Sequence, residues 1–202
     1  MPAIEDGGTW GILGGAFDPV HNGHLNLARQ LLIVQDLSGV IFIPSCFHPC
    51  KNSRESTSYQ DRVAMLKLAL EPQLDFEICE IEADQQLSGY TLDTIRALKT
   101  TYTTASFRFI IGADNLRQLP SWHKPEELLE EVVFLVGSRP GFDFGPQWQL
   151  PCDRIELIPI EPVDISSSLV RQSLKEGISG VILDRLVPAS VCEYIASHRL
   201  YQ

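Results

Sequence analysis

Trp10-Gly-Ile-Leu-Gly-Gly-Ala-Phe-Asp-Pro-Val-His-Asn-Gly-His24 is the stretch that decides how the first part of the chain folds. Its first four residues are mostly apolar and predict a short buried strand, and Gly14 and Gly15 after them favour a tight turn. Apolar residues then recur at helical spacing, at Leu25, Leu27, Ala28, Leu31 and Leu32. The stretch therefore predicts a strand, a turn and a helix in that order.

His21 and His24 stand three residues apart where this helix is expected to begin, so they share one face of it. Free backbone N–H groups at a helix start attract anions, and two imidazoles can add hydrogen bonds or positive charge. Gly23 would let a nucleotide approach the backbone, and Asp18 is expected to organise the Phe-Asp-Pro turn. The pair therefore favours a phosphate site, although such pairs also bind metal, cap helices or pack in cores.

Two common nucleotide-binding patterns are absent from the sequence. The chain has no Gly-x-x-x-x-Gly-Lys-Ser/Thr loop, and its early glycines do not form Gly-x-Gly-x-x-Gly. Kinase-like and dehydrogenase functions therefore lose support.

Composition indicates one ordinary α/β domain. The chain has 202 residues, of which 44% are hydrophobic and 21% are charged, so we expect a single domain over 1–202 with residues 1–8 as a loose tail. A formal net charge of −10 opposes binding to nucleic acid and requires a local cationic patch for any phosphate ligand. The sequence shows no bilayer-spanning run and no signal peptide, which predicts a cytosolic protein with no membrane partner.

The five cysteines show no regular framework, which favours reduced thiols. Cys46, His48 and Cys50 lie close enough to ligate zinc, but they lack a fourth ligand and the usual spacing. We therefore predict no metal site, with this cluster as the open alternative.

Further apolar runs alternate with helical stretches and predict a doubly wound parallel sheet. These runs cover residues 40–43, 76–78, 107–111, 132–136 and 155–158, and a loop is expected from Gly137 to Asp153. Ligands in such sheets bind beyond the carboxyl ends of the strands. Several polar motifs follow strands and should converge there: Gly14–His24, Ser45–Lys51, Gly112–Asp114 and Arg139.

Two of these regions suit the phosphates and ribose of a nucleotide. Ser166, Ser167 and Ser168 can cap a helix that runs to Lys175 and ends at Gly177, and with Arg171 they could also hold phosphates. Capping alone explains these serines equally well. Gly112 permits close approach and Asp114 could accept hydrogen bonds from ribose, or the two could form a turn with a helix cap.

Other residues suit a second, aromatic substrate. Trp122, beside His123, could stack on a pyridine ring, although a packing role is nearly as plausible. Lys51 and Arg139 could each bind a phosphate, and Arg139 could do so with two parallel hydrogen bonds.

The sequence resembles a known family, the bacterial nicotinate mononucleotide adenylyltransferases, which are nucleotidyltransferases with a His-x-Gly-His signature. The resemblance runs in order through nearly the whole chain from about Trp10. It rests on 21–24, 89–94, 110–115 with 119–122, 139–141, 165–171, and the ending 187–201. It implies a Rossmann-like nucleotidyltransferase fold.

The resemblance also implies a reaction, in which nicotinate mononucleotide attacks the α-phosphorus of ATP to give nicotinate adenine dinucleotide and pyrophosphate. Mg²⁺ would arrive with ATP, and a homo-oligomer is possible. The implied catalytic residues are His21, His24 and Arg171. The implied ATP site comprises Gly14, Gly15, Ala16, Phe17, His21, Gly23, His24, Gly112, Asp114, Ile165, Ser166, Ser167, Ser168 and Arg171. The implied nicotinate mononucleotide site comprises Ser45, Lys51, Thr91, Trp122, His123 and Arg139.

Three positions depart from the family pattern. His123 stands where a tyrosine often follows the tryptophan, Cys50 replaces a usual histidine, and Gly89 alters the residue pattern before Thr91. Two alternatives stay open: transfer to nicotinamide mononucleotide or another phosphorylated acceptor such as phosphopantetheine, and a regulatory module that binds nucleotide without turnover.

Overall fold

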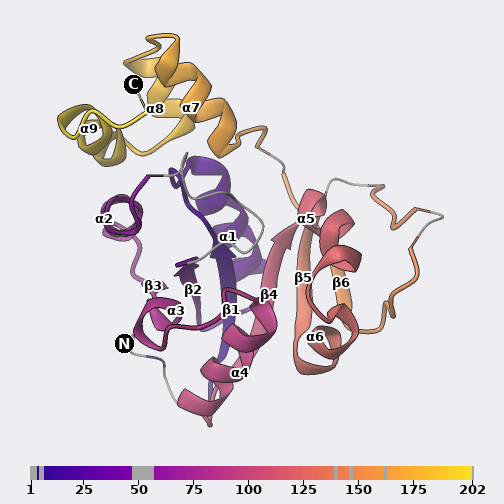
Figure 1. Ribbon diagram of the computed structural model, residues 1–202. Helices are drawn as coiled ribbons and strands as arrows, with labels where there is room; N and C mark the ends of the chain where they lie inside the picture. The colour runs from indigo at the N-terminus through magenta and orange to yellow at the C-terminus, as the bar shows by residue number, and fades with distance from the viewer. Residues whose placement is uncertain are drawn as a thin grey trace.

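One parallel sheet organises the chain, as seen in a computed structural model that describes residues 4, 7–46, 57–138, 141–145, 148–161 and 163–201. Its six strands lie in the order β3-β2-β1-β4-β5-β6 (Figure 1). The strands are β1 Thr9–Gly15, β2 Gly39–Pro44, β3 Phe76–Ile78, β4 Ser106–Gly112, β5 Val133–Ser138 and β6 Ile155–Pro159. The order reverses beside β1, as in doubly wound nucleotide-binding folds. The predicted strands and the predicted parallel sheet are confirmed.

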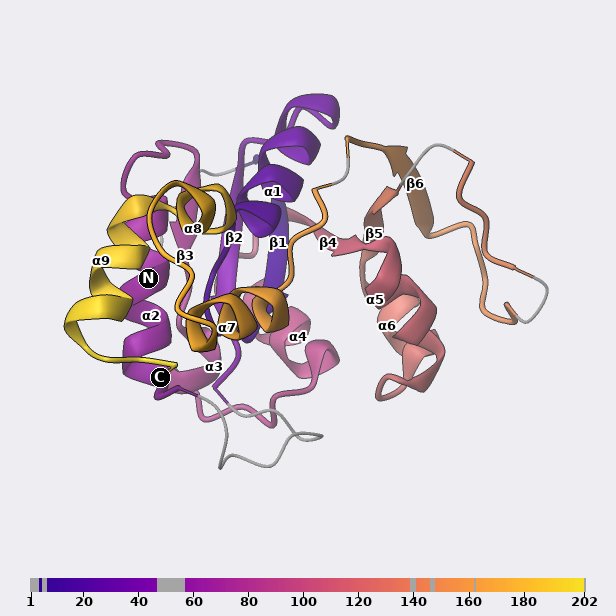
Figure 2. The same cartoon turned by 90° about the horizontal axis from the view of Figure 1, so that it is seen from above.

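Helices cover both faces of the sheet (Figures 1 and 2). Neighbouring residues of each strand face opposite sides, so Phe42 belongs to one apolar cluster while Ile41 and Ile43 belong to the other. The first cluster lies under α1 (Asn22–Val34), α2 (Tyr59–Leu70), α7 (Ser167–Lys175), α8 (Val181–Leu186) and α9 (Ala189–Ser197). The second lies under α3 (Ile81–Asp84), α4 (Thr91–Thr101), α5 (Ala113–Gln118), the short 3₁₀ turn η1 (Leu119–Ser121) and α6 (Pro125–Glu131).

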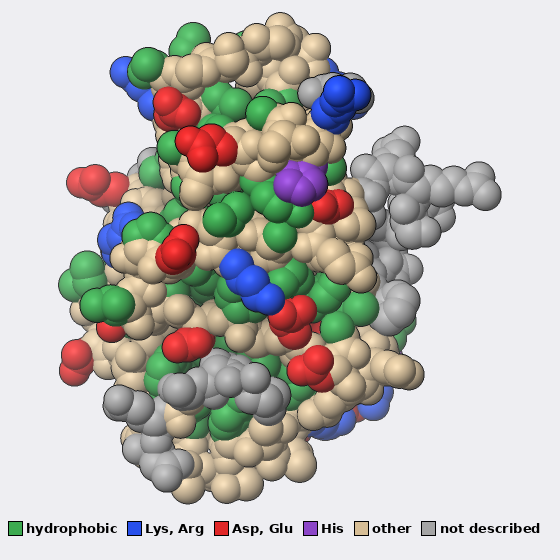
Figure 3. All heavy atoms as spheres, turned by 90° about the vertical axis from the view of Figure 1, so that its left-hand side faces the viewer, with side chains coloured by type: hydrophobic (Ala, Val, Ile, Leu, Met, Phe, Trp, Pro, Cys, Tyr) green, Lys and Arg blue, Asp and Glu red, His purple; other side chains and the backbone are tan. Residues whose placement is uncertain are grey.

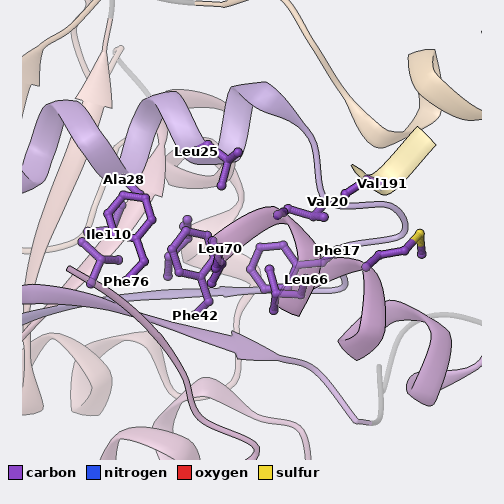
Figure 4. Packing of buried hydrophobic residues seen from close by; sticks show 14 of the residues in the cluster. Phe17, Val20, Leu25, Ala28, Phe42, Leu66, Leu70, Phe76, Ile110 and Val191 are labelled. Atoms are coloured by element: carbon purple, nitrogen blue, oxygen red, sulfur yellow. The ribbon is translucent and has the colours of Figure 1, made fainter. Parts of the chain in front are cut away.

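Aromatic rings fill the centre of the first cluster. The fully buried ring of Phe42 lies with its centroid 5.7 Å from that of Phe17 and 5.3 Å from that of Phe76 (Figure 4). Leu66 and Leu70 of α2 pack into the same cluster. This packing fixes Phe17, and so the turn that follows β1, to the core.

The two predicted glycine turns are partly wrong. Gly14 and Gly15 lie inside β1, where they pair with Ile43 and Pro44, and the left-handed residue of the following turn is Phe17, with φ of 49°. Gly137, expected to begin a loop, lies in β5, where it pairs with Gly112 and Ile158. A Cβ there would meet the side chains of Leu27 and Ile160. Glycine at 137 therefore serves close packing, and Gly14 and Gly15 continue the strand rather than reverse the chain.

The C-terminal helices lie over the carboxyl edge of the sheet and beside α2 (Figures 1 and 2). Tyr194 of α9 donates a hydrogen bond from its hydroxyl to Asp61 of α2 at 2.9 Å. Asn22, the first residue of α1, donates from its amide to the carbonyls of Asp184 (3.2 Å) and Arg185 (3.0 Å) in α8. These contacts attach the last part of the chain to the part that follows β1.

The predicted tail and loop are described only in part. Within 1–8, Ile4 packs against the second cluster and the carbonyl of Gly8 accepts from the Ser106 amide at 2.9 Å, so the chain is attached to the core at these two points. Between β5 and β6, Trp148 packs on the second cluster and donates to the carbonyl of Leu150 at 2.8 Å. In the described residues, no helix combines the length and apolarity needed to cross a membrane.

The face over α2, α3 and α9 carries acidic and basic side chains interspersed with apolar ones (Figure 3). Mixed charges of this kind give no extended field of one sign. This face therefore resembles an ordinary protein surface rather than one that binds a polyanion.

Replacement of Gly39 by alanine is expected to lower the free energy of unfolding by about 1–3 kcal/mol. A Cβ at this position would overlap the ring of Trp10 and lie 2.9 Å from the carbonyl of Asp75. Urea denaturation measures the effect.

Gly112→Ala is the matched control, because a Cβ there meets nothing within 4 Å and its φ of −84° suits any residue. Its stability should stay within about 0.5 kcal/mol of the parent. Equal stability of the two variants would contradict the tight packing of Gly39.

Candidate active site

Four of the predicted motifs begin where a strand ends. β1 ends at Gly15, β2 at Pro44, β4 at Gly112 and β5 at Ser138. Because the strands are parallel, these ends share one edge of the sheet, and α7 lies across it (Figure 2). The structure thus brings the described motifs to the edge where open α/β sheets bind ligands.

The turn after β1 is built around a buried phenylalanine. The ring of Phe17 is 1% exposed and meets the ring of His24 edge-on, with centroids 5.0 Å apart. Its side chain belongs to the core, so a role of Phe17 in ATP binding is restricted to its backbone. The carbonyl of Ala16 is likewise engaged, since it accepts from the guanidinium of Arg62 at 2.5 Å.

The two histidines stack on each other at the start of α1. Their ring centroids lie 3.6 Å apart with an interplanar angle of 23°. Nδ1 of His24 accepts a hydrogen bond from the backbone N–H of His21 at 3.2 Å, which leaves Nε2 of His24 as the protonated nitrogen of a neutral ring. Nδ1 of His21 is buried without a hydrogen-bond partner. Because Nδ1 of His21 is enclosed by protein, Nε2 of His24 is a nitrogen of this pair for which the described contacts leave a ligand interaction open.

Burial determines the charge of these rings. It lowers the pKa of His21 from 6.5 to about 4, and burial together with the charge of His21 lowers the pKa of His24 well below its usual value. Both imidazoles are therefore neutral near pH 7 in the free protein. They offer hydrogen bonds there, and the positive charge that the sequence also suggested has to come from elsewhere.

Gly23 separates this pair from the segment before α7. A Cβ on Gly23 would lie 2.9 Å from Nδ1 of His21 and 3.3 Å from the carbonyl oxygen of Ile165. Glycine is thus required by packing between two candidate ATP-binding segments, in addition to any approach of a nucleotide.

The start of α7 is fastened to the turn after β1. The hydroxyl of Ser167 donates to the carbonyl of Pro19 at 2.9 Å, and the guanidinium of Arg171 donates to the carbonyl of Asp18 at 2.6 Å. Arg171 also donates to the hydroxyl of Ser168 at 3.2 Å. Since a guanidinium carries five N–H donors, Arg171 retains donors beyond these two contacts.

The predicted helix cap at α7 is confirmed. The hydroxyl of Ser166 accepts from the Leu169 amide at 3.1 Å, and the helix ends before Gly177, whose φ is 75°. All three serine hydroxyls therefore have partners within the protein. Phosphate binding at this helix start would rely on backbone N–H groups and Arg171 more than on the hydroxyls.

Asp18 has a structural role, but its described side-chain contact is with the end of the chain rather than with the turn that it was expected to organise. Its carboxylate accepts a hydrogen bond of 2.6 Å from the hydroxyl of Tyr201, near the end of the chain. Burial and this hydrogen bond raise the pKa of Tyr201, so the phenol stays protonated as the donor. The turn is therefore held both by the hydrogen bonds that its carbonyls accept from α7 and by the contact of this carboxylate with Tyr201.

Gly112 and Asp114 lie at the end of β4 and in the first turn of α5. Neither conformation nor packing requires glycine at 112, because φ is −84° and the space around a Cβ is open. Asp114 is exposed beside it. This open space at the carboxyl edge is consistent with the predicted approach of a ribose.

Four of the residues predicted for the second substrate lie in the described part of the chain: Ser45, Thr91, Trp122 and His123. Ser45 follows β2, and its amide donates to the carbonyl of Gly15 at 2.9 Å. Thr91 is the first residue of α4, where helix N–H groups lack partners within the helix. Trp122 packs edge-on against Phe109 and Phe134, with centroids 6.2 and 6.3 Å away, and it stays partly exposed.

His123 stacks on Tyr90, with ring centroids 4.2 Å apart and an interplanar angle of 20°. This contact joins the segment after η1 to the residue before α4. Because Tyr90 directly precedes Thr91, the stacking brings two of the residues predicted for the acceptor into the same neighbourhood.

Two buried charged residues at this edge were missed by the sequence analysis: Arg62 and Glu82. Arg62 lies within α2 and Glu82 within α3, and neither stands in a recognisable motif. Charged residues in helical stretches normally indicate a solvent-exposed surface, so the sequence contains no signal that these two are buried.

Lys51, Arg139, His48 and Cys50 lie outside the described residues, so their predicted roles stay predictions. The described cysteines, Cys46, Cys79, Cys152 and Cys192, are free thiols. Among the residues that the structure describes, no group of three or more His, Cys, Asp or Glu side chains could hold a metal ion.

Comparison with known proteins agrees with this geometry. A family model described as cytidylyltransferase-like matches residues 12–173. A probable nicotinate-nucleotide adenylyltransferase of Geobacillus thermodenitrificans is 39% identical over 194 residues, which cover 96% of this chain and 86% of that protein. The nicotinate-nucleotide adenylyltransferase of Bacillus subtilis is 35% identical over 192 residues, covering 95% of this chain and 97% of that protein.

The fold comparison is independent of close sequence similarity. The nicotinic acid mononucleotide adenylyltransferase of Plasmodium falciparum, complexed with NaAD, has a TM-score of 0.79 at 20% identity, covering 96% of this chain and 97% of that chain. At this identity the likeness shows a shared fold. Together with the similar bacterial sequences and the matching family model, it shows that this chain belongs to the nicotinate-nucleotide adenylyltransferases of the cytidylyltransferase-like family.

Proposed function

We propose that this enzyme transfers the adenylyl group of ATP to the 5′-phosphate of nicotinate mononucleotide, giving nicotinate adenine dinucleotide and pyrophosphate for NAD biosynthesis. The observation that carries the proposal is the contact between two helix starts, in which Arg171 and Ser167 of α7 bind the turn leading to the histidines of α1. This contact assembles imidazole, guanidinium and backbone N–H donors around one region of the sheet edge. The names of the similar bacterial enzymes agree with it.

The reaction needs no nucleophile from the protein. The attacking phosphate oxygen is already an anion, so the enzyme contributes alignment of the two substrates and stabilisation of charge on the phosphate oxygens. Pyrophosphate leaves as the new bond to the α-phosphorus forms. The donors at the sheet edge suit these tasks.

Neutral histidines fit this chemistry as hydrogen-bond donors. His24 presents Nε2–H, because its Nδ1 is occupied by the backbone N–H of His21. Positive charge at neutral pH would come from Arg171 and from the N-termini of α1 and α7. We assign His21 and His24 to the α-phosphate and Arg171 to the departing pyrophosphate.

Mg²⁺ would enter as part of the Mg-ATP substrate, as is usual for this ion with nucleotides. Cytosolic location and a possible homo-oligomer stay predictions.

The pyridine ring would bind between Trp122 and the start of α4. The partly exposed indole can stack on it, and the N–H groups at Thr91 can receive a carboxylate. Preference for the acid over the amide would follow from these N–H groups, since an anion gains more from a helix start than a neutral amide does.

Purified protein supplied with Mg-ATP and either mononucleotide tests the function directly. We expect pyrophosphate and dinucleotide in equal amounts, with a higher kcat/KM for nicotinate mononucleotide than for nicotinamide mononucleotide. Equal kcat/KM values for the two mononucleotides would indicate an enzyme that accepts either one. Nucleotide binding without pyrophosphate release would indicate a regulatory module.

His24→Ala should lower kcat by roughly 10²-fold to 10³-fold, because it removes a donor from the reacting phosphate. Pyrophosphate release measures the rate, and circular dichroism checks the fold. His198→Ala serves as the matched control, since that exposed histidine stacks on Tyr194 of α9. Wild-type turnover of His24→Ala would contradict the assignment.

The low pKa of His21 predicts a pH-dependent stability. The unfolded chain gains a proton on this ring near pH 6.5 and the folded chain only near pH 4. The free energy of unfolding should therefore fall by about 3 kcal/mol as the pH drops through this window. Urea denaturation of the parent and of His21→Asn between pH 7 and 4 measures the difference. If the free energies of unfolding of the parent and of His21→Asn change with pH in parallel, the folded protein does not disfavour the charged form of His21.

A further inference from the structure

A pair of buried, oppositely charged side chains flanks the end of β2. Arg62 is 6% exposed and Glu82 is 7% exposed. Placing charges in a protein interior is costly unless hydrogen bonds compensate for lost hydration. The hydrogen bonds that Arg62 and Glu82 make therefore indicate what the two residues do.

Arg62 fastens three segments of backbone. Its guanidinium donates to the carbonyls of Ala16 at 2.5 Å, Ser45 at 2.9 Å and Thr57 at 3.4 Å. The first follows β1, the second follows β2, and the third precedes α2. The residue thus joins the turn of the histidine motif to the segment that begins at Ser45.

Glu82 continues this connection to α4. One oxygen, Oε2, accepts from the amide of Cys46 at 3.1 Å, and the other, Oε1, accepts from the hydroxyl of Thr94 at 2.8 Å. The same hydroxyl lies 3.3 Å from the carbonyl of Tyr90, the residue that caps α4. A single carboxylate therefore spans the gap between the end of β2 and the first turn of α4.

These two ends carry the residues assigned to the acceptor. Ser45 adjoins Cys46, and Thr91 is the first residue of α4. Tyr90 provides no side-chain cap for this helix start. Leu92 anchors the first turn in the second apolar cluster, and the hydrogen bond from Thr94 to Glu82 links it to the end of β2. Burial raises the pKa of Glu82, while its two hydrogen bonds and the charge of Arg62 oppose that rise.

The ATP half of the site is held by other contacts. The start of α7 is fastened by Ser167 to Pro19 and by Arg171 to Asp18, and Glu82 touches none of these residues in the described contacts. A change at Thr94 should therefore act on one substrate more than on the other.

We propose that Glu82, acting through Thr94 and Cys46, is a positioning residue that sets the spacing of the two backbone segments binding the pyridine mononucleotide. The inference rests on the proposed function. Errors of about 1 Å in such spacing are costly because the attacking phosphate has to be aligned with the α-phosphorus.

Thr94→Val tests this proposal with Thr94→Ser as the matched control. Valine keeps the shape of the side chain but removes the hydroxyl, whereas serine keeps the hydroxyl. We expect KM for nicotinate mononucleotide to rise about tenfold in Thr94→Val, with KM for ATP within about twofold of the parent. Thr94→Ser should behave like the parent for both substrates. If Thr94→Val does not fold, Thr94→Ala serves instead. It removes the hydroxyl together with the γ methyl group and places no new apolar group beside Glu82.

Each other result has a distinct meaning. Equal increases in both KM values, or unchanged KM values in a folded but less stable variant, would overturn the proposal and leave Glu82 a purely structural role. A parent protein that forms no dinucleotide from these substrates would instead refute the proposed function.

Discussion

The attachment of α7 to the turn after β1 is the constraint on which the site depends. Ser167 and Arg171 donate to the carbonyls of Pro19 and Asp18, which stand about 150 positions earlier in the chain. These carbonyls belong to a turn that forms no ladder with a neighbouring strand, so they need donors from elsewhere. The same hydrogen bonds that satisfy them bring a guanidinium and a helix start beside the histidines. The contacts that satisfy this turn are thus the same ones that bring together the residues of the proposed phosphate site.

An acidic protein that binds a triphosphate has to supply favourable potential locally. The formal net charge is −10, and burial keeps His21 and His24 neutral in the free protein. The starts of α1 and α7 lie near the guanidinium of Arg171, and together they supply such a potential. Among the described residues assigned to the ATP half of the site, Arg171 carries the single full positive charge. The two rings therefore contribute hydrogen-bonding groups to this half of the site, and Arg171 and the helix starts contribute the positive potential.

Much of this arrangement could be predicted from the sequence, for physical reasons that differ from element to element. Apolar runs of strand length between helical stretches define the sheet, and the rule for parallel strands then places Gly112 and Ser45 at one edge. Ser166 as a cap and Gly177 as a helix end follow from local backbone chemistry. Gly14 and Gly15 were misplaced because a glycine inside a strand looks the same in sequence as one that reverses the chain.

Arg62 and Glu82 lay beyond sequence reasoning because their role depends on contacts between segments that are distant in sequence. In sequence, each is a charged residue in a helical stretch, which normally indicates a solvated surface. Only the fold reveals that they bind backbone groups at Ala16, Ser45 and Cys46, where parallel strands end, and that Glu82 also accepts from Thr94. A sheet that opens its carboxyl edge to ligands necessarily exposes such groups, and buried charges that satisfy them can hold ligand-binding loops in place without meeting a ligand.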